Sequence, residues 1–330
     1  MINPKHTAYD LIQMQSLPLD IKIHMTKERI RQWYEYWNGQ VYISFSGGKD
    51  STVLKHIVDS IYDDIPAMFV NTGLEYPEIQ KFAMSQKNVV TVRPEMRFDE
   101  VIKKYGYPVV SKEVAQTVWE AKKNAKTGKY AYRIKKLNGE LLDKNGKIST
   151  YNIPKWRFLL DAPYDISHKC CDVMKKRPAK TYEKKTGRKA IIGTLASEST
   201  LRKTQWVKYG CNAFGSKRPT SQPLSFWTEQ DILHYIKQFD VPYCSVYGDI
   251  VPDNEGTLLK TTGCDRTGCI FCMFGCHLEK EPNRFQRLKE THPRQYEYCI
   301  GGGEYVDGKW QPSKEGLGLG KVLDYINVKY

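Results

Sequence analysis

The chain has 330 residues, of which 40% are hydrophobic and 27% charged, values that are ordinary for a folded protein and exclude wholesale disorder. Lys and Arg number 51 against 37 Asp and Glu, and the resulting net charge of +14 favours a polyanionic partner without identifying one. No stretch approaches the roughly 18 consecutive apolar residues of a membrane span, and the first residues carry scattered charges, so we expect a cytoplasmic protein without membrane contact.

The first half of the chain predicts strands that alternate with helices. Residues 25–38 have the pattern of a basic amphipathic helix, a strand follows at 40–45, and residues 51–62 again have helical apolar spacing. Three more strands are predicted at 67–70, 89–92 and 190–193. A helix is predicted at 228–239, where Thr228 is the capping residue. This alternation predicts an α/β fold with a mostly parallel sheet flanked by helices, whose ligands bind at the carboxyl ends of the strands.

Two segments depart from this pattern. A basic segment at about 121–158 is rich in lysine and contains tyrosines, and its turn signals at Asn138-Gly139 and Asn145-Gly146 predict an insertion that carries a hairpin. Alternating cations and aromatic rings suit phosphate contacts and base stacking, although a solvated lysine-rich surface is the plainer interpretation. The tail from Gly301 is glycine-rich and lacks periodicity, which predicts a surface wrap.

A glycine-rich turn joins the first strand to the next helix, in the string Ser46-Gly47-Gly48-Lys49-Asp50-Ser51. Such a turn aims backbone N–H groups and the positive end of a helix dipole at one point, where a phosphate would sit. The string is not a Walker A loop, which would place a glycine at Ile43 and a Ser or Thr at Asp50. A plain tight turn is the alternative, because glycine also serves there for structural reasons.

The string from Ser46 to Ser51, preceded by an apolar strand, resembles the signature of the PP-loop ATP pyrophosphatases. In that superfamily the loop cradles the pyrophosphate that leaves when ATP adenylates a substrate, so the resemblance implies a site for ATP with Mg²⁺. Lys49 would neutralise developing charge, Ser51 would donate a hydrogen bond, and Asp50 would help to hold the loop and the metal. The resemblance thus implies binding by the whole string Ser46, Gly47, Gly48, Lys49, Asp50 and Ser51, and catalysis by the last three.

Other segments look like the branch of that superfamily that contains the adenylylsulfate and phosphoadenylylsulfate reductases. They are Asn71-Thr72-Gly73 with Tyr76-Pro77, and Gly193-Thr194-x-Ala196-x-Glu198-Ser199 with Arg202. The resemblance runs from about 40 to 275 and implies nucleotide-binding roles for Thr72, Gly73, Gly193, Glu198 and Arg202. We therefore expect an N-terminal helical segment at 1–39, a PP-loop ATP-binding domain at 40–250 and a cysteine-rich iron–sulfur and C-terminal region at 251–330.

Six of the nine cysteines form two groups in the sequence: Cys170, Cys171, Cys264, Cys269, Cys272 and Cys276. A Cys-x-x-Cys pair holds one metal or cluster from a single turn, which predicts an iron–sulfur cluster, with zinc or plain reduced thiols as alternatives. Resemblance to the adenylylsulfate reductases selects Cys170, Cys171, Cys269 and Cys272 as ligands of a [4Fe-4S] cluster. Resemblance to the DNA phosphorothioation ATP pyrophosphatases instead draws in Cys264 and Cys276.

Three functions compete. Reduction of a sulfonucleotide is disfavoured because residues 300–330 lack the nucleophilic cysteine of the reductases, and because Leu195 stands where those enzymes place an arginine. Thiolation of nucleic acid accounts for the ATP loop, the cysteines and the charge together; it implies DNA more than RNA as partner and a sulfur donor such as a cysteine desulfurase. A non-catalytic nucleotide-binding module is the third, and the intact Lys49 and Asp50 argue against it.

Overall fold

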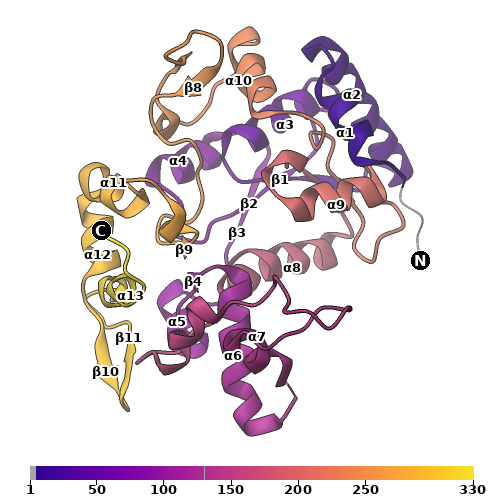
Figure 1. Ribbon diagram of the computed structural model, residues 1–330. Helices are drawn as coiled ribbons and strands as arrows, with labels where there is room; N and C mark the ends of the chain where they lie inside the picture. Colours follow the sequence, from indigo (N-terminus) through magenta and orange to yellow (C-terminus); the bar gives the residue numbers. More distant parts are fainter. Residues whose placement is uncertain (1–4, 130) are drawn as a thin grey trace. The chain divides into compact units, whose positions relative to one another are not determined.

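A computed structural model describes residues 5–129 and 131–330, with the side chains of 124–127 outside the description (Figure 1). The chain divides into two compact units, each built from separate stretches of sequence. The first unit comprises Met1–Asn71, Glu75–Arg93 and Arg177–Thr267. The second comprises Thr72–Leu74, Pro94–Lys176 and Gly268–Tyr330. None of the described helices is long and apolar enough to cross a membrane.

The first unit contains a five-stranded sheet with the strand order β3-β2-β1-β5-β6, in which all pairs are parallel. Its strands are β1 (Val41–Phe45), β2 (Ala67–Val70), β3 (Val89–Val92), β5 (Lys189–Ile192) and β6 (Thr220–Ser221). In the central strand Ile43 pairs with both Ala67 and Ile191, so β1 is hydrogen-bonded on both edges. This sheet confirms the predicted α/β fold class.

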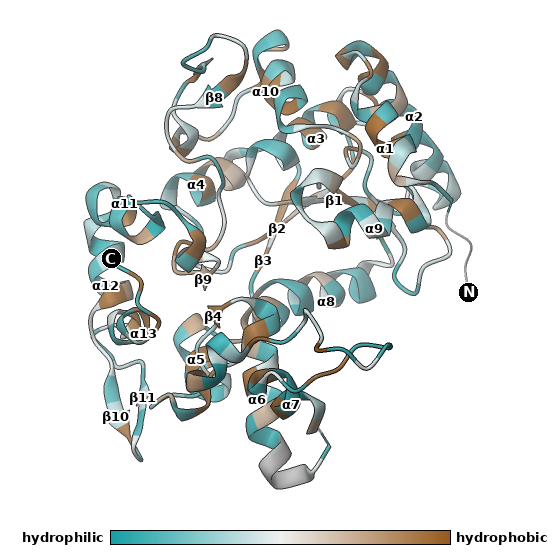
Figure 2. Cartoon of the chain, in the orientation of Figure 1, coloured by the Kyte–Doolittle hydropathy of each residue, from teal (hydrophilic) through white to brown (hydrophobic). Residues whose placement is uncertain are grey.

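Seven α-helices belong to the described part of this unit: α1 (Ala8–Gln15), α2 (Leu19–Tyr36), α3 (Lys49–Asp59), α4 (Pro77–Ser85), α8 (Arg177–Thr186), α9 (Thr200–Tyr209) and α10 (Glu229–Gln238). Short elements complete the unit, namely the turns η3 (Ala196–Glu198) and η4 (Ser245–Tyr247) and the antiparallel pair β7 (Ile250–Pro252) and β8 (Leu259–Thr261). Figure 2 colours β2 as hydrophobic and α3 in part. Val53, Leu54 and Ile57 of α3 are fully buried. This core fixes β1 and α3, and with them the loop that joins the two elements.

Two helix predictions compare differently with the structure. The helix predicted from Thr228 is present as α10, where Thr228 and Asp231 form a capping box. The helix predicted at 25–38 begins earlier, at Leu19, directly after Pro18. Its first buried position is Lys22, whose ammonium is paired with Asp231 at 2.7 Å. A lysine on the buried face hides the apolar periodicity of the first turn, so the pattern understates the helix.

The second unit is mostly helical. Its main helices are α5 (Phe98–Tyr105), α6 (Lys112–Thr127), α7 (Ala131–Asn138), α11 (Arg284–Thr291), α12 (Pro293–Ile300) and α13 (Leu319–Tyr325). The shorter elements are η1 (Pro154–Asp161), the π-helical turn η2 (Asp172–Lys176) and η5 (Cys276–Leu278). Its strands are β4 (Val109–Val110) and β9 (Met273–Phe274), which pair in parallel, and β10 (Glu304–Val306) and β11 (Lys309–Gln311), which pair antiparallel.

The predicted hairpin in the basic insertion is present only in part, because α6 and α7 occupy the first half of that segment. Ala121 of α6 and Leu137 of α7 are buried, so packing of these helices outweighs the lysines around them. In the described part of this segment, antiparallel pairing consists of a bridge between Leu142 and Ile148 around the Asn145-Gly146 turn.

The predicted surface wrap after Gly301 is also wrong. The tail forms the β10–β11 hairpin and then α13, in which Leu319, Val322 and Leu323 are fully buried. A helix of seven residues is too short to show a clear period, and the glycines that precede it suggest a loop. Gly316 lies against the carbonyl oxygens of Tyr298 and Gly301, where a Cβ atom would not fit, so this glycine serves close packing.

Candidate active site

The predicted phosphate loop lies between β1 and α3, at the carboxyl end of the central strand. Gly47 has a φ of +73°, and a Cβ atom on it would lie 3.0 Å from Ile79 and 3.2 Å from Ala83 of α4. Gly193 follows β5, and a Cβ atom there would lie 2.9 Å from the carbonyl oxygen of Asp50. Both glycines therefore permit close backbone approach around the start of α3.

Two serine hydroxyls organise the loop. The hydroxyls of Ser46 and Ser51 are 3.0 Å apart, and the Ser51 hydroxyl accepts from the N–H of Ser46 at 3.2 Å. The N–H of Gly48 donates to the Ser46 hydroxyl at 3.3 Å, and the Ser51 hydroxyl donates to the carbonyl of Gly48 at 2.9 Å. These bonds hold the loop at the N-terminus of α3, where the helix dipole favours an anion.

Lys49 is buried and its ammonium is surrounded by oxygen atoms. It lies 3.1 Å from the carboxylate of Glu229, 3.1 Å from the carbonyl of Asp265 and 3.7 Å from Asp50. Burial by itself lowers the pKa of Lys49, but the negative charges of Asp50 and Glu229 outweigh it and raise the pKa above its ordinary value. Burial raises the pKa of Asp50, and Lys49 opposes that shift. Lys49 is therefore a fixed cation beside the loop.

Two more hydroxyls lie at the start of α3. The main-chain N–H of Lys49 donates to the hydroxyl of Tyr247 at 3.1 Å, and this hydroxyl is 2.6 Å from that of Thr267. Tyr247 is 2% exposed, and burial raises the pKa of its phenol. A neutral hydroxyl pair thus satisfies one of the N–H groups that a helix N-terminus offers to an anion.

Glu198, at the end of η3, is paired with two arginines. Its carboxylate forms ion pairs with Arg202 of α9 and with Arg266, and it accepts the N–H of Leu195 at 3.1 Å. The structure therefore places Glu198 and Arg202, which the sequence predicted, in the same unit as the loop. Thr72 and Gly73 belong to the second unit, where the Thr72 hydroxyl accepts the N–H of Leu74 at 3.1 Å.

Five of the six candidate metal ligands belong to the second unit, where their thiols act on one another electrostatically. The thiol of Cys170 donates to the sulfur of Cys171 at 3.9 Å, at the start of the π-helical turn, and Cys269 and Cys272 act electrostatically on Cys170. The hydrogen bond from Cys170 lowers the pKa of Cys171, and the charges of Lys112 and Lys175 act in the same direction.

The environment of these thiols is cationic. Besides the two lysines, Arg284 donates to the carbonyl of Cys272 at 2.9 Å and is held by Glu279 through its Nε at 2.8 Å. Among the described residues, no three His, Cys, Asp or Glu side chains lie close enough to hold a single metal ion. A [4Fe-4S] cluster binds each thiolate to a different iron, so its ligands lie farther apart than those of zinc. The donor set fits such a cluster.

The other two candidate ligands have different surroundings. Cys276 is 1% exposed, its thiol donates to the carbonyl of Met273 at 3.0 Å, and burial raises its pKa to about 12. Cys264 is half-buried in the first unit, and its carbonyl accepts the hydroxyl of Thr261 at 3.1 Å.

Cys299, near the C-terminus, is fully buried in α12, and burial raises its pKa.

Comparison with known proteins identifies the family. The phosphoadenosine phosphosulfate reductase domain matches residues 40–274. The chain belongs to the phosphoadenosine phosphosulfate reductase domain family. This finding confirms the predicted placement in the reductase-like branch of the PP-loop superfamily.

Two uncharacterised proteins of Methanocaldococcus jannaschii are similar to this member of the family. One is 24% identical over 279 residues, which is 80% of this chain, and the other is 23% identical over 297 residues, which is 86%. The chain spans about half the length of these curated relatives, 48% of each.

Solved structures of three other proteins are also similar. The phosphoadenylyl-sulfate reductase of Candida auris in a phosphate complex has 16% identity and a TM-score of 0.37, over 70% of this chain and 91% of that one. The FMN adenylyltransferase of Candida glabrata in complex with ATP has 13% identity and a TM-score of 0.37, over 73% and 65%. The U34-tRNA thiolase NcsA of Methanococcus maripaludis with its [4Fe-4S] cluster has 15% identity and a TM-score of 0.32, over 68% and 66%.

The sequence did not predict several residues that lie around the phosphate loop. The structure adds Glu229, Tyr247, Asp265, Arg266 and Thr267. The last three stand between Cys264 and Cys269, in a segment whose predicted site residues are only its cysteines. An arginine and a threonine beside a glycine in that segment were the available signal. Glu229 was recognised only as a helix-start residue, and nothing in the sequence singles out Tyr247.

Two cations of the insertion form ion pairs inside the second unit. Arg133 pairs with Glu120 at 2.5 Å, and Lys136 is buried and paired with Glu113. The exposed cations of the described segment are Lys123, Lys129, Lys135, Lys144, Lys147, Lys155 and Arg157. Tyr132 and Tyr151 are exposed as well, whereas Tyr130, also expected to stack on bases, lies outside the described residues.

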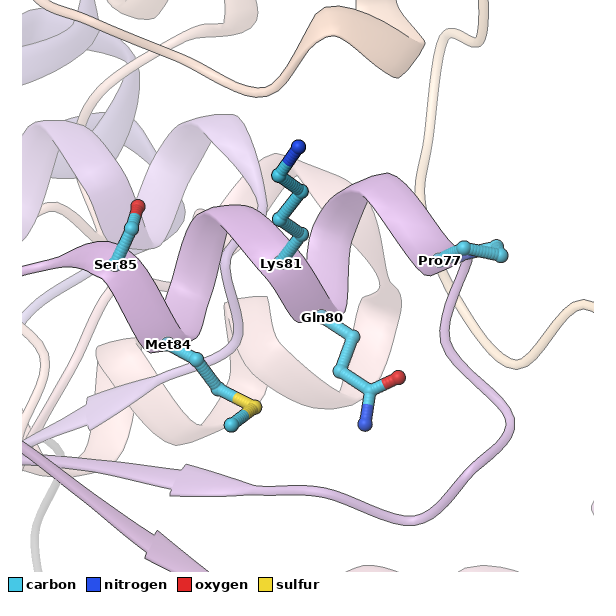
Figure 3. A pocket seen from close by; sticks show the side chains of 5 residues that line it. All are labelled: Pro77, Gln80, Lys81, Met84 and Ser85. Atoms are coloured by element: carbon cyan, nitrogen blue, oxygen red, sulfur yellow. The ribbon is translucent and has the colours of Figure 1, made fainter.

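A shallow hollow of about 460 Å³ lies along α4 (Figure 3). Its lining residues all come from that one helix: Pro77, Gln80, Lys81, Met84 and Ser85. The buried residues Ile79 and Ala83 face Gly47, so the hollow lies on other sides of the helix than the phosphate loop. We assign it no ligand.

Proposed function

We propose that this protein is an ATP pyrophosphatase that activates a nucleic-acid substrate for sulfur transfer. An oxygen of the substrate attacks the α-phosphorus of ATP, the bond between the α-phosphorus and the bridging oxygen breaks, and pyrophosphate leaves with the electron pair. A hydrosulfide, released from the persulfide of a cysteine desulfurase by a thiol reductant, then displaces AMP together with the activated oxygen. The reductase-domain family supports an enzyme of this class without specifying the reaction.

The observation that carries the proposal is the loop between β1 and α3. Its serine hydroxyls and the ammonium of Lys49 lie together at the N-terminus of α3. Donors and a fixed cation in that position stabilise the charge that develops on departing pyrophosphate. Ser51 and Lys49 would bind its oxygens, and Asp50 would face the Mg²⁺ that accompanies ATP.

The test is the fate of ATP labelled at the α-phosphate, incubated with Mg²⁺ and with or without duplex DNA. We expect AMP and pyrophosphate as products, no turnover for Lys49→Ala or Asp50→Ala, and partial turnover for Lys49→Arg, which keeps the charge. Lys237→Ala, an exposed position of α10 in the same unit, is the control and should behave as the wild type. Release of ADP and phosphate by the purified protein would overturn the proposal, and nucleotide binding without turnover under all conditions would favour a regulatory module.

The proposed cluster ligands are Cys170, Cys171, Cys269 and Cys272, because these thiols interact with one another among cations. Thiolate ligands and a cluster carry negative charge, which Lys112, Lys175 and Arg284 would compensate. A [4Fe-4S] cluster held by four thiolates supplies single electrons when it is bound. Free thiolates of this kind persist in a reducing compartment, which is why we place the protein in the cytoplasm.

Cys299 bears on the reductase alternative. Sulfonucleotide reduction by a C-terminal cysteine needs a thiolate that reaches the substrate, whereas Cys299 is fully buried and burial raises its pKa. Cys299 is therefore unsuited to the role of that nucleophile. The exposed cations between Lys123 and Arg157 support a nucleic-acid partner, DNA before RNA, because cations there can neutralise backbone phosphates.

A further inference from the structure

Arg202 and Arg266 converge on one carboxylate in the first unit. Each arginine forms an ion pair with Glu198, through Nη1 of Arg202 to Oε2 and through Nη2 of Arg266 to Oε1. The Oε2 atom also accepts the N–H of Leu195. Two guanidinium groups on one carboxylate leave an excess positive charge at this point. Burial lowers the pKa of Arg202, and the charge of Arg266 acts in the same direction.

Arg266 is fixed beside the ATP loop by the residues on either side of it. The carbonyl of Asp265 accepts the ammonium of Lys49 at 3.1 Å, and the hydroxyl of Thr267 is 2.6 Å from that of Tyr247, which accepts the N–H of Lys49. Both arginines also act electrostatically on Asp50. The paired guanidinium groups therefore lie within charge–charge range of the residues proposed to cleave ATP.

Guanidinium groups in this arrangement suit a tetrahedral oxyanion. Each has five N–H donors in a planar fork that matches phosphate oxygens. In the described part of the chain, the contacts to Glu198 use one terminal nitrogen of each fork, and the Arg266 side chain is 66% exposed. Arg202 is the third residue of α9, so the N-terminal end of this helix adds to the positive potential.

We propose that Arg202 and Arg266 together bind a phosphate group of a substrate, and that Glu198 orients the two side chains for it. The inference rests on the proposed function, which supplies two sources of that phosphate: the α-phosphate of ATP and the backbone of the nucleic-acid acceptor. The loop itself binds pyrophosphate, so we expect the affinity for pyrophosphate not to depend on Arg266.

The experiment measures binding without turnover, by calorimetric titration of the full chain with three probes. The probes are pyrophosphate with Mg²⁺, α,β-methylene-ATP with Mg²⁺, and a short DNA duplex. Variants are Arg266→Ala and Arg266→Lys. Arg31→Ala is the matched control, because Arg31 is an exposed arginine of the same unit that is likewise paired with a glutamate, Glu28.

We expect Arg266→Ala to lower the binding affinity for one of the two substrate probes roughly tenfold to a hundredfold. This is the loss associated with hydrogen bonds to a charged group. Arg266→Lys should retain part of the affinity because it keeps the charge without the fork. Loss confined to α,β-methylene-ATP identifies the α-phosphate, and loss confined to DNA identifies the acceptor. Arg31→Ala and pyrophosphate binding should not change.

Unchanged binding of both substrate probes by Arg266→Ala would overturn the inference. An equal loss of pyrophosphate binding in Arg266→Ala and Arg266→Lys would overturn it too, because the substitution would then act by disturbing Thr267 and the loop. These titrations stay informative if ATP is not cleaved between the α- and β-phosphates, since failure of the proposed reaction shows in the product assay instead.

Discussion

The main-chain N–H of Lys49 donates a hydrogen bond to the hydroxyl of Tyr247, 3.1 Å away. The donor lies at the start of α3, on the side where the loop offers N–H groups to a phosphate. Tyr247 follows Lys49 by 198 residues in sequence and is almost completely buried against it. A neutral hydroxyl therefore takes up a donor that pyrophosphate would use.

This contact predicts that Tyr247→Phe binds pyrophosphate more tightly than the wild type. Without the hydroxyl, the Lys49 N–H loses its partner in the ligand-free protein, and pyrophosphate regains that hydrogen bond. A net hydrogen bond is worth about 0.5–1.5 kcal/mol, so the affinity should rise roughly twofold to tenfold by calorimetry. Tyr243→Phe is the control, because its hydroxyl donates to the carbonyl of Gly248 instead. Weaker binding by Tyr247→Phe would show that the hydroxyl holds the phosphate.

Iron content tests the thiol group of the second unit. We expect anaerobically purified protein to be brown and to contain iron and sulfide, and Cys269→Ala or Cys272→Ala to abolish both. Two double variants distinguish the two ligand sets. The first combines Cys170→Ala with Cys171→Ala, and the second combines Cys264→Ala with Cys276→Ala. The first should lose iron, whereas the second should keep it, since the Cys276 thiol is engaged by the carbonyl of Met273. The reverse result, or stoichiometric zinc from iron-replete cells, contradicts the assignment.

The ion pair between Glu120 and Arg133 predicts a pH-dependent stability of the second unit. Burial by itself raises the pKa of Glu120, but hydrogen bonds from Gln116 and Arg133 outweigh it and hold the pKa below its ordinary value. The stabilisation is then present above the unfolded pKa of about 4.3 and is lost as the pH falls through the folded pKa.

Glu120→Gln should therefore lower the free energy of unfolding by about 1–3 kcal/mol near neutral pH, because both partners of the pair are largely buried. The difference from the wild type should shrink as the pH falls below about 4, measured as thermal midpoints across the acid range. Glu140→Gln, at an exposed glutamate whose carboxylate accepts only from Asn138 in the described contacts, should change little at any pH. A difference that grows on acidification would mean that the ion pair is not its source.

Salt dependence tests the nucleic-acid partner. If about five exposed cations of the insertion contact phosphates, the log–log slope of affinity against salt should be roughly −4 to −5 on duplex DNA. Deletion would remove buried residues such as Leu137, so we prefer replacement by glutamine of five exposed cations: Lys135, Lys144, Lys147, Lys155 and Arg157. These changes should flatten the slope.

The matched control replaces five exposed lysines of the first unit: Lys87, Lys184, Lys185, Lys217 and Lys237. It removes the same charge and should leave the slope closer to that of the wild type. Absence of DNA binding at low salt, or equal slopes for the two variants, would mean that the insertion is only a solvated surface.

The strand–loop–helix unit around Ser46 to Ser51 and the class of the fold are predictable from the sequence alone. These features depend on residues that are neighbours in the chain: an apolar strand, glycines with the backbone freedom for a tight turn, and a helix that begins directly after it. Short-range preferences of this kind are visible in a linear string. The α10 helix was predictable for the same reason, since Thr228 and Asp231 cap it locally.

The contacts of Lys49 and the interactions among the cysteines depend on the tertiary structure and could not be predicted from the sequence. Glu229, Tyr247 and Asp265 reach Lys49 from segments 180 to 216 residues later in the chain, and Cys170 interacts with Cys272 across a hundred residues. Parts of the insertion and of the tail are helical because packing of Leu137 and Leu323 outweighs the lysines and glycines around them. Burial and long-range pairing depend on how the whole chain folds, so local composition carries no record of them.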